Sequence, residues 1–147
     1  TRLYLLQDVG FLDGTYGPTA WVEHIDAANN FLQRNRDVAE AVLGLHFDLE
    51  PHQNPNWSTN QTELFGMFMS LLHEVGTYVR DGTSAPALAH EELSIDVPHW
   101  FKGQPYATGF PTDLLQYNYT VAFMIYGGTG AQLFNYFGAD SELEDIA

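Results

Sequence analysis

The sequence reads VLGLHFDLE from residue 42 to residue 50. Because side chains of a β-strand alternate between two faces, this segment presents one apolar face and one polar face. The apolar face carries Leu45, Phe47 and Leu49, and the opposite face carries Gly44, His46, Asp48 and Glu50. Polarity on the second face increases toward the carboxyl end of the segment. This pattern favours a (β/α) barrel, in which helices cover the outside and the inside leads to an active-site mouth.

Further apolar runs of strand length alternate with helix-period segments along the whole chain. The expected strands span residues 2–7, 42–48, 93–97 and 120–126, and the expected helices span about 19–35, 60–80 and 130–137. Such alternation predicts a parallel sheet of the α/β class. No linker or repeat divides residues 1–147, so they are expected to form a single domain or segment.

Four strands cannot close a (β/α)8 barrel, which takes eight strands and about 250 residues. The chain is therefore expected to supply about four βα units of a partial TIM-type barrel. Because the sequence opens at Thr1 on an expected strand, it is interpreted as a mature or trimmed piece of a longer protein. Its possible partners are the remainder of that polypeptide or further copies of the chain. An open parallel α/β sheet is the alternative architecture.

Composition excludes several function classes. Nineteen acidic residues against five basic ones give a formal charge of −14, so nucleic acid is not expected as a partner. The same charge favours neutral or cationic ligands. No apolar run approaches the roughly 20 residues that cross a bilayer, so membrane insertion is not expected. The absence of cysteine excludes disulfides, thiolate zinc sites and cysteine nucleophiles.

Three N-glycosylation sequons point to the secretory route. They begin at Asn56, Asn60 and Asn118, whereas a chain of this length would carry roughly one by chance. The sequence therefore predicts an extracellular, glycosylated protein.

The paired carboxylates of Asp48 and Glu50 are the strongest chemical signal. Two carboxyl groups in one pocket push their pKa values apart, so one can act as an acid near neutral pH while the other stays ionised. Cleavage of a glycosidic bond requires this pair. Tyr126 and Asp96, on the polar faces of two other expected strands, would reach the same space. The chemistry predicted from these residues is glycoside hydrolysis.

Two motifs carry a family resemblance. Residues 43–50, LGLHFDLE, resemble the DGxDxDxE strand of the family-18 chitinases, and Met124-Ile125-Tyr126 resembles their MxYD strand. The resemblance implies that Glu50 is the general acid, that Asp48 orients the N-acetyl group of the substrate, and that Tyr126 hydrogen-bonds its carbonyl oxygen. Residues 48–51, DLEP, also resemble glycosidase-like barrels with a DxEP strand end, which leaves the sugar open.

Substrate contacts are expected from the same face and from the rim of the mouth. Six aromatic residues fall on the expected rim loops: Phe11, Tyr16, Trp57, Trp100, Phe101 and Tyr106. Sugar rings stack on aromatic planes, so residues 99–101 are the preferred stacking site, although the same rings could plug the barrel top. The predicted substrate-binding residues are His46, Asp96, Trp100 and Met124.

No cofactor and no metal are predicted. The glycine-rich segment 127–130 lacks the lysine of a nucleotide-binding loop. His46, Asp48, Glu50 and His52 could supply metal ligands, but alternate side chains of one strand lie about 7 Å apart, which disfavours a shared ion.

The sequence leaves a second function open. Leu43, His46 and Gly127 stand where the chitinase motifs have aspartate, so the acidic relay beneath the acid is absent. The first hypothesis is a glycoside hydrolase-like protein that acts on or binds polysaccharide. The alternative is a non-catalytic secreted glycoprotein that binds carbohydrate or assembles with copies of itself.

Overall fold

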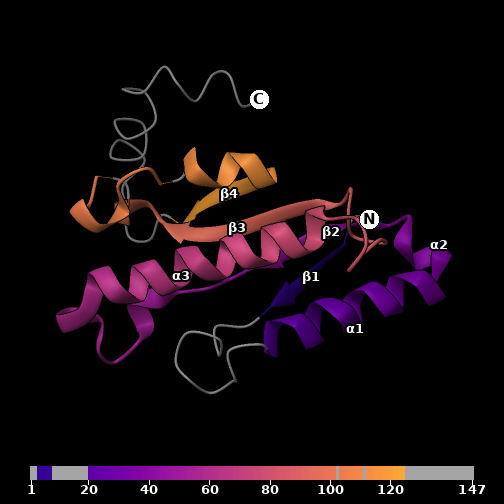
Figure 1. Ribbon diagram of the computed structural model, residues 1–147, viewed down its shortest axis with the longest axis horizontal. Helices are drawn as coiled ribbons and strands as arrows, with labels where there is room; N and C mark the ends of the chain where they lie inside the picture. Colours follow the sequence, from indigo (N-terminus) through magenta and orange to yellow (C-terminus); the bar gives the residue numbers. More distant parts are fainter. Residues whose placement is uncertain (1–2, 8–19, 102, 111, 125–147) are drawn as a thin grey trace.

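The computed structural model of the protein describes residues 3–7, 20–101, 103–110 and 112–124 (Figure 1). Its centre is a sheet of four parallel strands in the order β1, β2, β3, β4. The strands are β1 (Leu3–Gln7), β2 (Val42–Phe47), β3 (Glu92–Pro98) and β4 (Tyr119–Met124). The prediction of an α/β fold with parallel strands is confirmed.

Helices occupy the connections between these strands. α1 (Ala20–Arg34) and the short α2 (Arg36–Ala39) precede β2, and α3 (Trp57–Arg80) connects β2 to β3. Short 3-10 helices lie in the connections after β2 and β3: η2 (Pro51–Gln53), η3 (His99–Phe101), η4 (Pro105–Ala107) and η5 (Thr112–Tyr117). The helix expected over residues 130–137 lies outside the described residues.

Helix α3 begins at Trp57, earlier than the predicted start at residue 60. The backbone of Asn60 is not helical, with φ −129° and ψ 34°, so a short first segment meets the main helix at that residue. A residue that caps a helix has such non-helical dihedral angles. Asn60 therefore marks a kink inside α3.

The core lies between the sheet and the two long helices, both of which pack on the same sheet face (Figure 1). The apolar face of β2 and β3 is buried against them, with Leu45, Leu93, Ile95 and Val97 fully buried. Helix α3 contributes Phe68, Leu72, Val75 and Val79, and α1 contributes Trp21, Ile25 and Leu32. Trp21 of α1 is thus part of the core. Removing this apolar surface from water is the main stabilising contribution to the fold.

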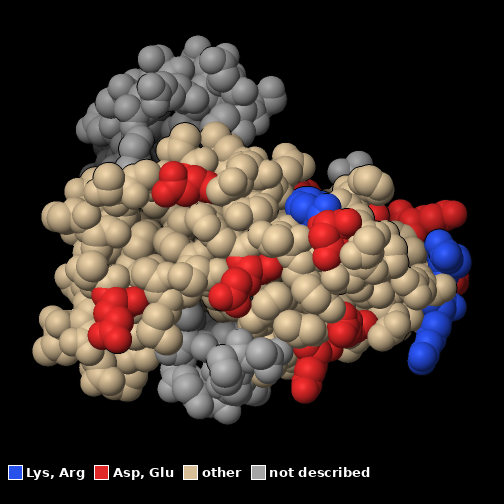
Figure 2. Space-filling model, in the orientation of Figure 1, with Lys and Arg blue, Asp and Glu red and all other residues tan. Residues whose placement is uncertain are grey.

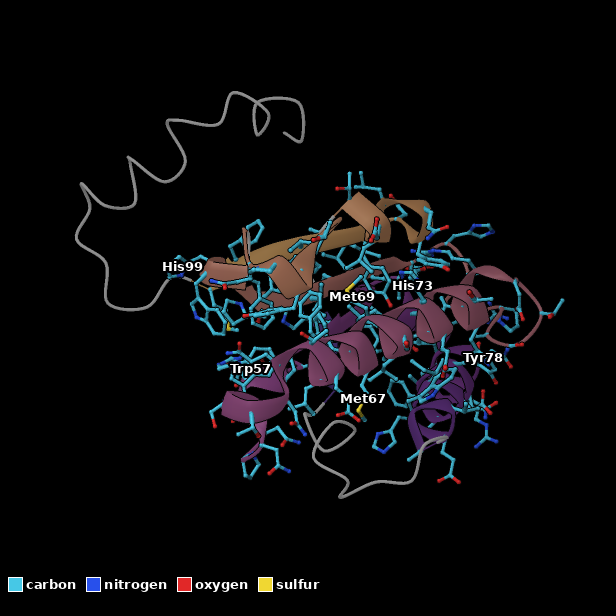
Figure 3. All side chains as sticks on the ribbon, turned by 60° about the vertical axis from the view of Figure 1, so that its left-hand side comes forward. Trp57, Met67, Met69, His73, Tyr78 and His99 are labelled. Atoms are coloured by element: carbon cyan, nitrogen blue, oxygen red, sulfur yellow. The ribbon has the colours of Figure 1, made fainter. Side chains whose placement is uncertain are left out.

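The two long helices also contact each other. The Tyr78 hydroxyl of α3 donates a hydrogen bond of 2.7 Å to Asp26 Oδ1 of α1, and the Tyr78 ring meets Trp21 edge to face. That hydrogen bond to a carboxylate, together with burial, raises the pKa of Tyr78. Figure 3 shows Tyr78 on α3 beside the ribbon of α1.

The opposite face of the sheet carries the polar side chains. In the described ranges, both long helices lie on the apolar face, so His46 and Asp96 project from the side away from them. The described strands form a sheet with β1 and β4 at its edges, which does not by itself make a closed barrel. Among the described helices, none combines the length and hydropathy needed to cross a bilayer.

Candidate functional site

The polar face of β2 and β3 holds a hydrogen-bonded chain of three side chains. Strand register places His46 of β2 directly beside Ser94 of β3. The His46 ring bridges two groups of β3: Nδ1 lies 2.8 Å from Ser94 Oγ, and Nε2 lies 2.9 Å from Asp96 Oδ2. The structure thus brings together His46 and Asp96, two of the predicted substrate-binding residues. Ser94 completes the chain and is a residue that the sequence analysis did not select.

Exposure differs along this chain. Ser94 is 4% exposed, whereas the side chains of His46 and Asp96 are 21% and 27% exposed. The hydroxyl end is therefore buried, and the carboxylate end is the most accessible of the three groups. The sequence carries one indication of a role for Ser94. It lies two residues before Asp96, so the two side chains share one face of the strand.

Asp48 and Glu50 lie just beyond the carboxyl end of β2, on either side of the buried Leu49. Asp48 is half-buried. The Glu50 side chain is 14% exposed, with Oε1 located 3.6 Å from His52 Nε2. Its other oxygen, Oε2, accepts a hydrogen bond from the Gln53 side-chain amide. Both Glu50 oxygens therefore have polar neighbours within the same turn.

The ring of His52 joins Glu50 to a cluster of aromatic side chains. It packs edge to face on Trp100, with ring centroids 5.3 Å apart, and on Phe101 at 6.1 Å. Among the described residues, its Nδ1 atom is buried and has no hydrogen-bond partner. Glu50 thus lies next to a histidine that is held by aromatic rings.

This aromatic cluster joins the end of the sheet to the start of α3. Trp57 packs against Trp100 and stacks on Phe101, and Tyr106 meets Trp57 edge to face at 5.5 Å. Burial raises the pKa of Tyr106. Figure 3 shows Trp57 and His99 at the same end of the molecule.

Phe101 does not form part of an exposed stacking surface. It is fully buried and packs on Phe65, Phe68 and Phe110, so its predicted role in sugar stacking is wrong. The sequence pattern of aromatic residues could not distinguish rings exposed at the mouth from rings buried in the core, because their burial depends on where α3 packs. Trp57 and Trp100 remain partly exposed at this end of the sheet.

The remaining predicted residues lie at the end of β4 or outside the described ranges. Met124, at the end of β4, is partly exposed, and its backbone carbonyl oxygen accepts a hydrogen bond of 3.2 Å from His99 Nδ1. Tyr126, Phe11 and Tyr16 lie outside the described residues. The described ranges contain no group of three or more His, Cys, Asp or Glu residues arranged to hold a metal ion.

All three sequon asparagines are exposed. Asn56 and Asn60 lie at the start of α3, and Asn118 lies in the turn before β4 with a φ of 57°. Asparagine tolerates this left-handed conformation better than most residues. The acceptor side chains are therefore open to solvent.

Charge is unevenly distributed over the described surface. In Figure 2, acidic side chains are spread across the visible face, and most basic ones gather at the end where α2 lies.

Comparison of the chain with protein-family models, with curated proteins and with solved structures found no match.

Proposed function

We propose that this protein is an extracellular glycoside hydrolase-like protein that acts on a polysaccharide, with Glu50 as the general acid. The observation that carries the proposal is the surroundings of Glu50 at the carboxyl end of a parallel sheet. Its side chain is largely shielded from solvent and lies next to His52, whose ring packs on the indole of Trp100. A shielded carboxyl group beside partly exposed indoles suits a site that binds a sugar ring and protonates its glycosidic oxygen.

The proposed architecture is a portion of a (β/α)8 barrel. Two observations support it: the strands are parallel and follow the order of the sequence, and both long helices lie on the apolar face. Sequential parallel strands whose helices cover one face are the arrangement of βα units in a TIM barrel. The polar face would then line the inside, with the site at the carboxyl ends of the strands. The remaining strands would come from the rest of the parent polypeptide or from a second copy.

In the proposed reaction, the Glu50 carboxyl group donates its proton to the oxygen of the leaving sugar as the glycosidic bond breaks. If the substrate carries N-acetyl groups, Asp48 orients the acetamide whose carbonyl oxygen attacks the anomeric carbon, and Tyr126 hydrogen-bonds that oxygen. Trp100 stacks on a sugar ring, while His46, Asp96 and Met124 contact its hydroxyl groups. The formal charge of −14 suits a neutral or cationic glycan better than an acidic one.

The second candidate function is carbohydrate binding without hydrolysis. The observation that favours it is that both carboxylate oxygens of Glu50 have a polar neighbour within one turn, Gln53 for Oε2 and His52 for Oε1. A carboxylate held in this way accepts hydrogen bonds from sugar hydroxyl groups without having to transfer a proton. Self-assembly through the polar face or the sheet edges belongs to the same alternative.

Glycan hydrolysis and glycan binding, measured together, distinguish these functions. The whole chain is incubated with soluble oligosaccharides of N-acetylglucosamine, glucosamine and glucose, and new reducing ends and bound sugar are quantified. We expect Glu50→Gln to lower hydrolysis by more than about 100-fold and to leave binding within about threefold. Glu74→Gln is the matched control, because Glu74 is exposed on α3.

Each outcome has one meaning for the proposal. Hydrolysis that survives Glu50→Gln unchanged rejects Glu50 as the acid. Binding with no hydrolysis by the wild-type chain supports the non-catalytic alternative. A chain that neither binds nor cleaves any of the three sugars argues against both functions for these glycans.

A further inference from the structure

We infer that Asp96 is a ligand-contacting carboxylate of this site, and that His46 and buried Ser94 are positioning residues that hold it through a cross-strand relay. The inference rests on the proposed function, since it assigns a role within the same polar face. It goes further because it adds Ser94 to the site and states which of the three residues contacts the ligand. Where the chitinase motif has an aspartate, this chain has His46, and His46 connects β2 to β3 instead of continuing an acidic relay along β2.

Strand register creates the relay. His46 pairs with Ser94 in the β2–β3 register, and Asp96 lies two residues farther along the same face of β3. Two residues of a strand span about 6.6 Å, a distance that an imidazole ring with nitrogens on both sides can bridge. The observed contacts of 2.8 Å and 2.9 Å on the two ring nitrogens are ordinary hydrogen-bond lengths.

Hydrogen-bond chemistry determines the orientation of the ring. A carboxylate only accepts hydrogen bonds, so His46 Nε2 carries a hydrogen and donates it to Asp96 Oδ2. In a neutral imidazole the other nitrogen then accepts, and Nδ1 takes its hydrogen bond from the Ser94 hydroxyl. Asp96 therefore selects the tautomer, and the Ser94 hydroxyl, which can donate or accept, donates to Nδ1 and holds the ring in place.

Solvent exposure indicates which member of the relay contacts a ligand. Ser94 is the most buried member and Asp96 the most exposed, so a ligand on the polar face meets the carboxylate first. On the adjacent strand, Asp96 faces Ala122, which is small and exposed. The β4 residue paired with Asp96 thus presents only a methyl group to the carboxylate, a small neighbour that suits a sugar hydroxyl group beside it.

The chemistry expected of Asp96 is the acceptance of hydrogen bonds from ligand hydroxyl groups. Its second oxygen, Oδ1, provides the acceptor sites, while Oδ2 is occupied by His46. Charge-assisted hydrogen bonds of this kind are about twice as strong as neutral ones. A carboxylate already held by a ring and a buried hydroxyl loses little conformational freedom when a ligand binds.

The first test is made without ligand, by long-range ¹H–¹⁵N spectroscopy of the histidine rings in the whole ¹⁵N-labelled chain. His46→Gln identifies the His46 signals. We expect wild-type His46 to be protonated at Nε2 and unprotonated at Nδ1. Ser94→Ala should leave Nε2 protonated and shift the Nδ1 signal, because that nitrogen loses its hydrogen-bond donor, and Ser94→Thr, which keeps the hydroxyl, should restore the wild-type spectrum. An Nδ1 signal that is unchanged in Ser94→Ala would show that Ser94 does not donate to the ring, and that result would overturn the relay.

The second test measures binding of hexamers of N-acetylglucosamine, glucosamine and glucose. For a hexamer that binds, we expect Asp96→Asn to weaken affinity at least about tenfold and Ser94→Ala about fivefold, with recovery in Ser94→Thr. Asp37→Asn, on the exposed surface of α2, is the charge-matched control and should change affinity less than twofold.

The two tests separate this inference from the proposed function. Binding that is unaffected by Asp96→Asn overturns the role of Asp96. Covalent labelling of Ser94 by a fluorophosphonate would also overturn it, because the reactive end would then be the hydroxyl. If the wild-type chain binds none of the hexamers, the proposed function and the ligand role of Asp96 both fail for these sugars, and the ring spectrum still decides the relay.

Discussion

Gly44 of β2 approaches the backbone of Glu92 of β3 so closely that no larger residue fits at position 44. A Cβ atom there would lie 1.8 Å from the Glu92 carbonyl oxygen. The two residues are paired in the β2–β3 register, which brings His46 beside Ser94 two residues later. The close approach at Gly44 is therefore linked to the register on which the polar face depends.

The first prediction is that Gly44→Ala destabilises the protein by more than about 2 kcal/mol, because backbone atoms of β3 must move to admit the methyl group. Gly66→Ala is the matched control. Gly66 lies in α3 with no atom near its Cβ position, so alanine should stabilise the helix by about 0.5–1 kcal/mol. Urea unfolding measures both changes. Equal stability of the two variants would contradict the close approach.

The second prediction concerns Arg80, which ties the end of α3 to two loops. Its guanidinium donates to the carbonyl oxygens of Tyr117 at 3.0 Å, Ala89 at 2.9 Å and Glu91 at 2.8 Å. Burial lowers the pKa of this group. Arg80→Lys keeps the charge but not the planar fork of donors, so we expect a loss of about 2–3 kcal/mol of unfolding free energy.

Arg34→Lys is the control for this substitution, because Arg34 is exposed in the last turn of α1. It should change stability by less than about 0.5 kcal/mol. The prediction fails if both lysine variants unfold at the same urea concentration as the wild type.

The third prediction is a loss of stability in alkali that depends on Tyr119. Its buried hydroxyl donates a hydrogen bond of 3.0 Å to the Leu72 carbonyl oxygen, and burial raises its pKa above the ordinary value of about 10. The unfolded chain therefore loses this proton at a lower pH than the folded chain. Stability should be unaffected by this group below about pH 10 and should fall as the pH rises further.

Tyr119→Phe tests this linkage. The variant should lose about 1 kcal/mol of unfolding free energy at neutral pH, because the hydrogen bond is missing. Between pH 9.5 and 11 its unfolding free energy should fall less steeply than that of the wild type. Urea midpoints measured across this range decide the matter. Parallel curves for the two proteins would show that Tyr119 does not contribute to the alkaline transition.

The fourth prediction is that Asn118 carries an N-linked glycan when the chain is expressed through a secretory pathway. The residue is exposed in a turn, and its acceptor motif is completed by Thr120, which is exposed on β4. Thr120→Ala should remove one glycan, seen as a smaller mass shift on enzymatic deglycosylation. Thr120→Ser keeps the motif and should keep the glycan. The same mass shift for the wild type and Thr120→Ala would rule out modification at Asn118.

Local patterns predicted much of the fold. The alternation of apolar and polar residues along 93–97 predicts that Leu93, Ile95 and Val97 share one buried face, and the structure has all three fully buried. The helix from about residue 60 was recognised from its apolar stripe, but not its short first segment from Trp57. Helix and strand periodicity are properties of neighbouring residues, whereas the extra turn at Trp57 depends on packing against Trp100 and Phe101.

The candidate site was predicted only in part, for the same physical reason. His46, Asp48, Glu50 and Asp96 were selected because alternation placed them on one face. Ser94 was not selected, because its place on the same face as Asp96 indicates a role only once its partner His46 is known. Phe101 was misplaced because an aromatic residue after a strand can either face solvent or enter the core.

The amino-acid order alone determined which residues become strands, which face of each strand is apolar, and which side chains carry charge, because these depend on spacing along the chain. Only the tertiary structure decided which polar groups meet. The hydrogen bonds of His46 to Ser94 and Asp96 span sequence separations of 48 and 50 positions. Such contacts exist only once the register between β2 and β3 is set, and that register follows from packing the helices on the opposite face.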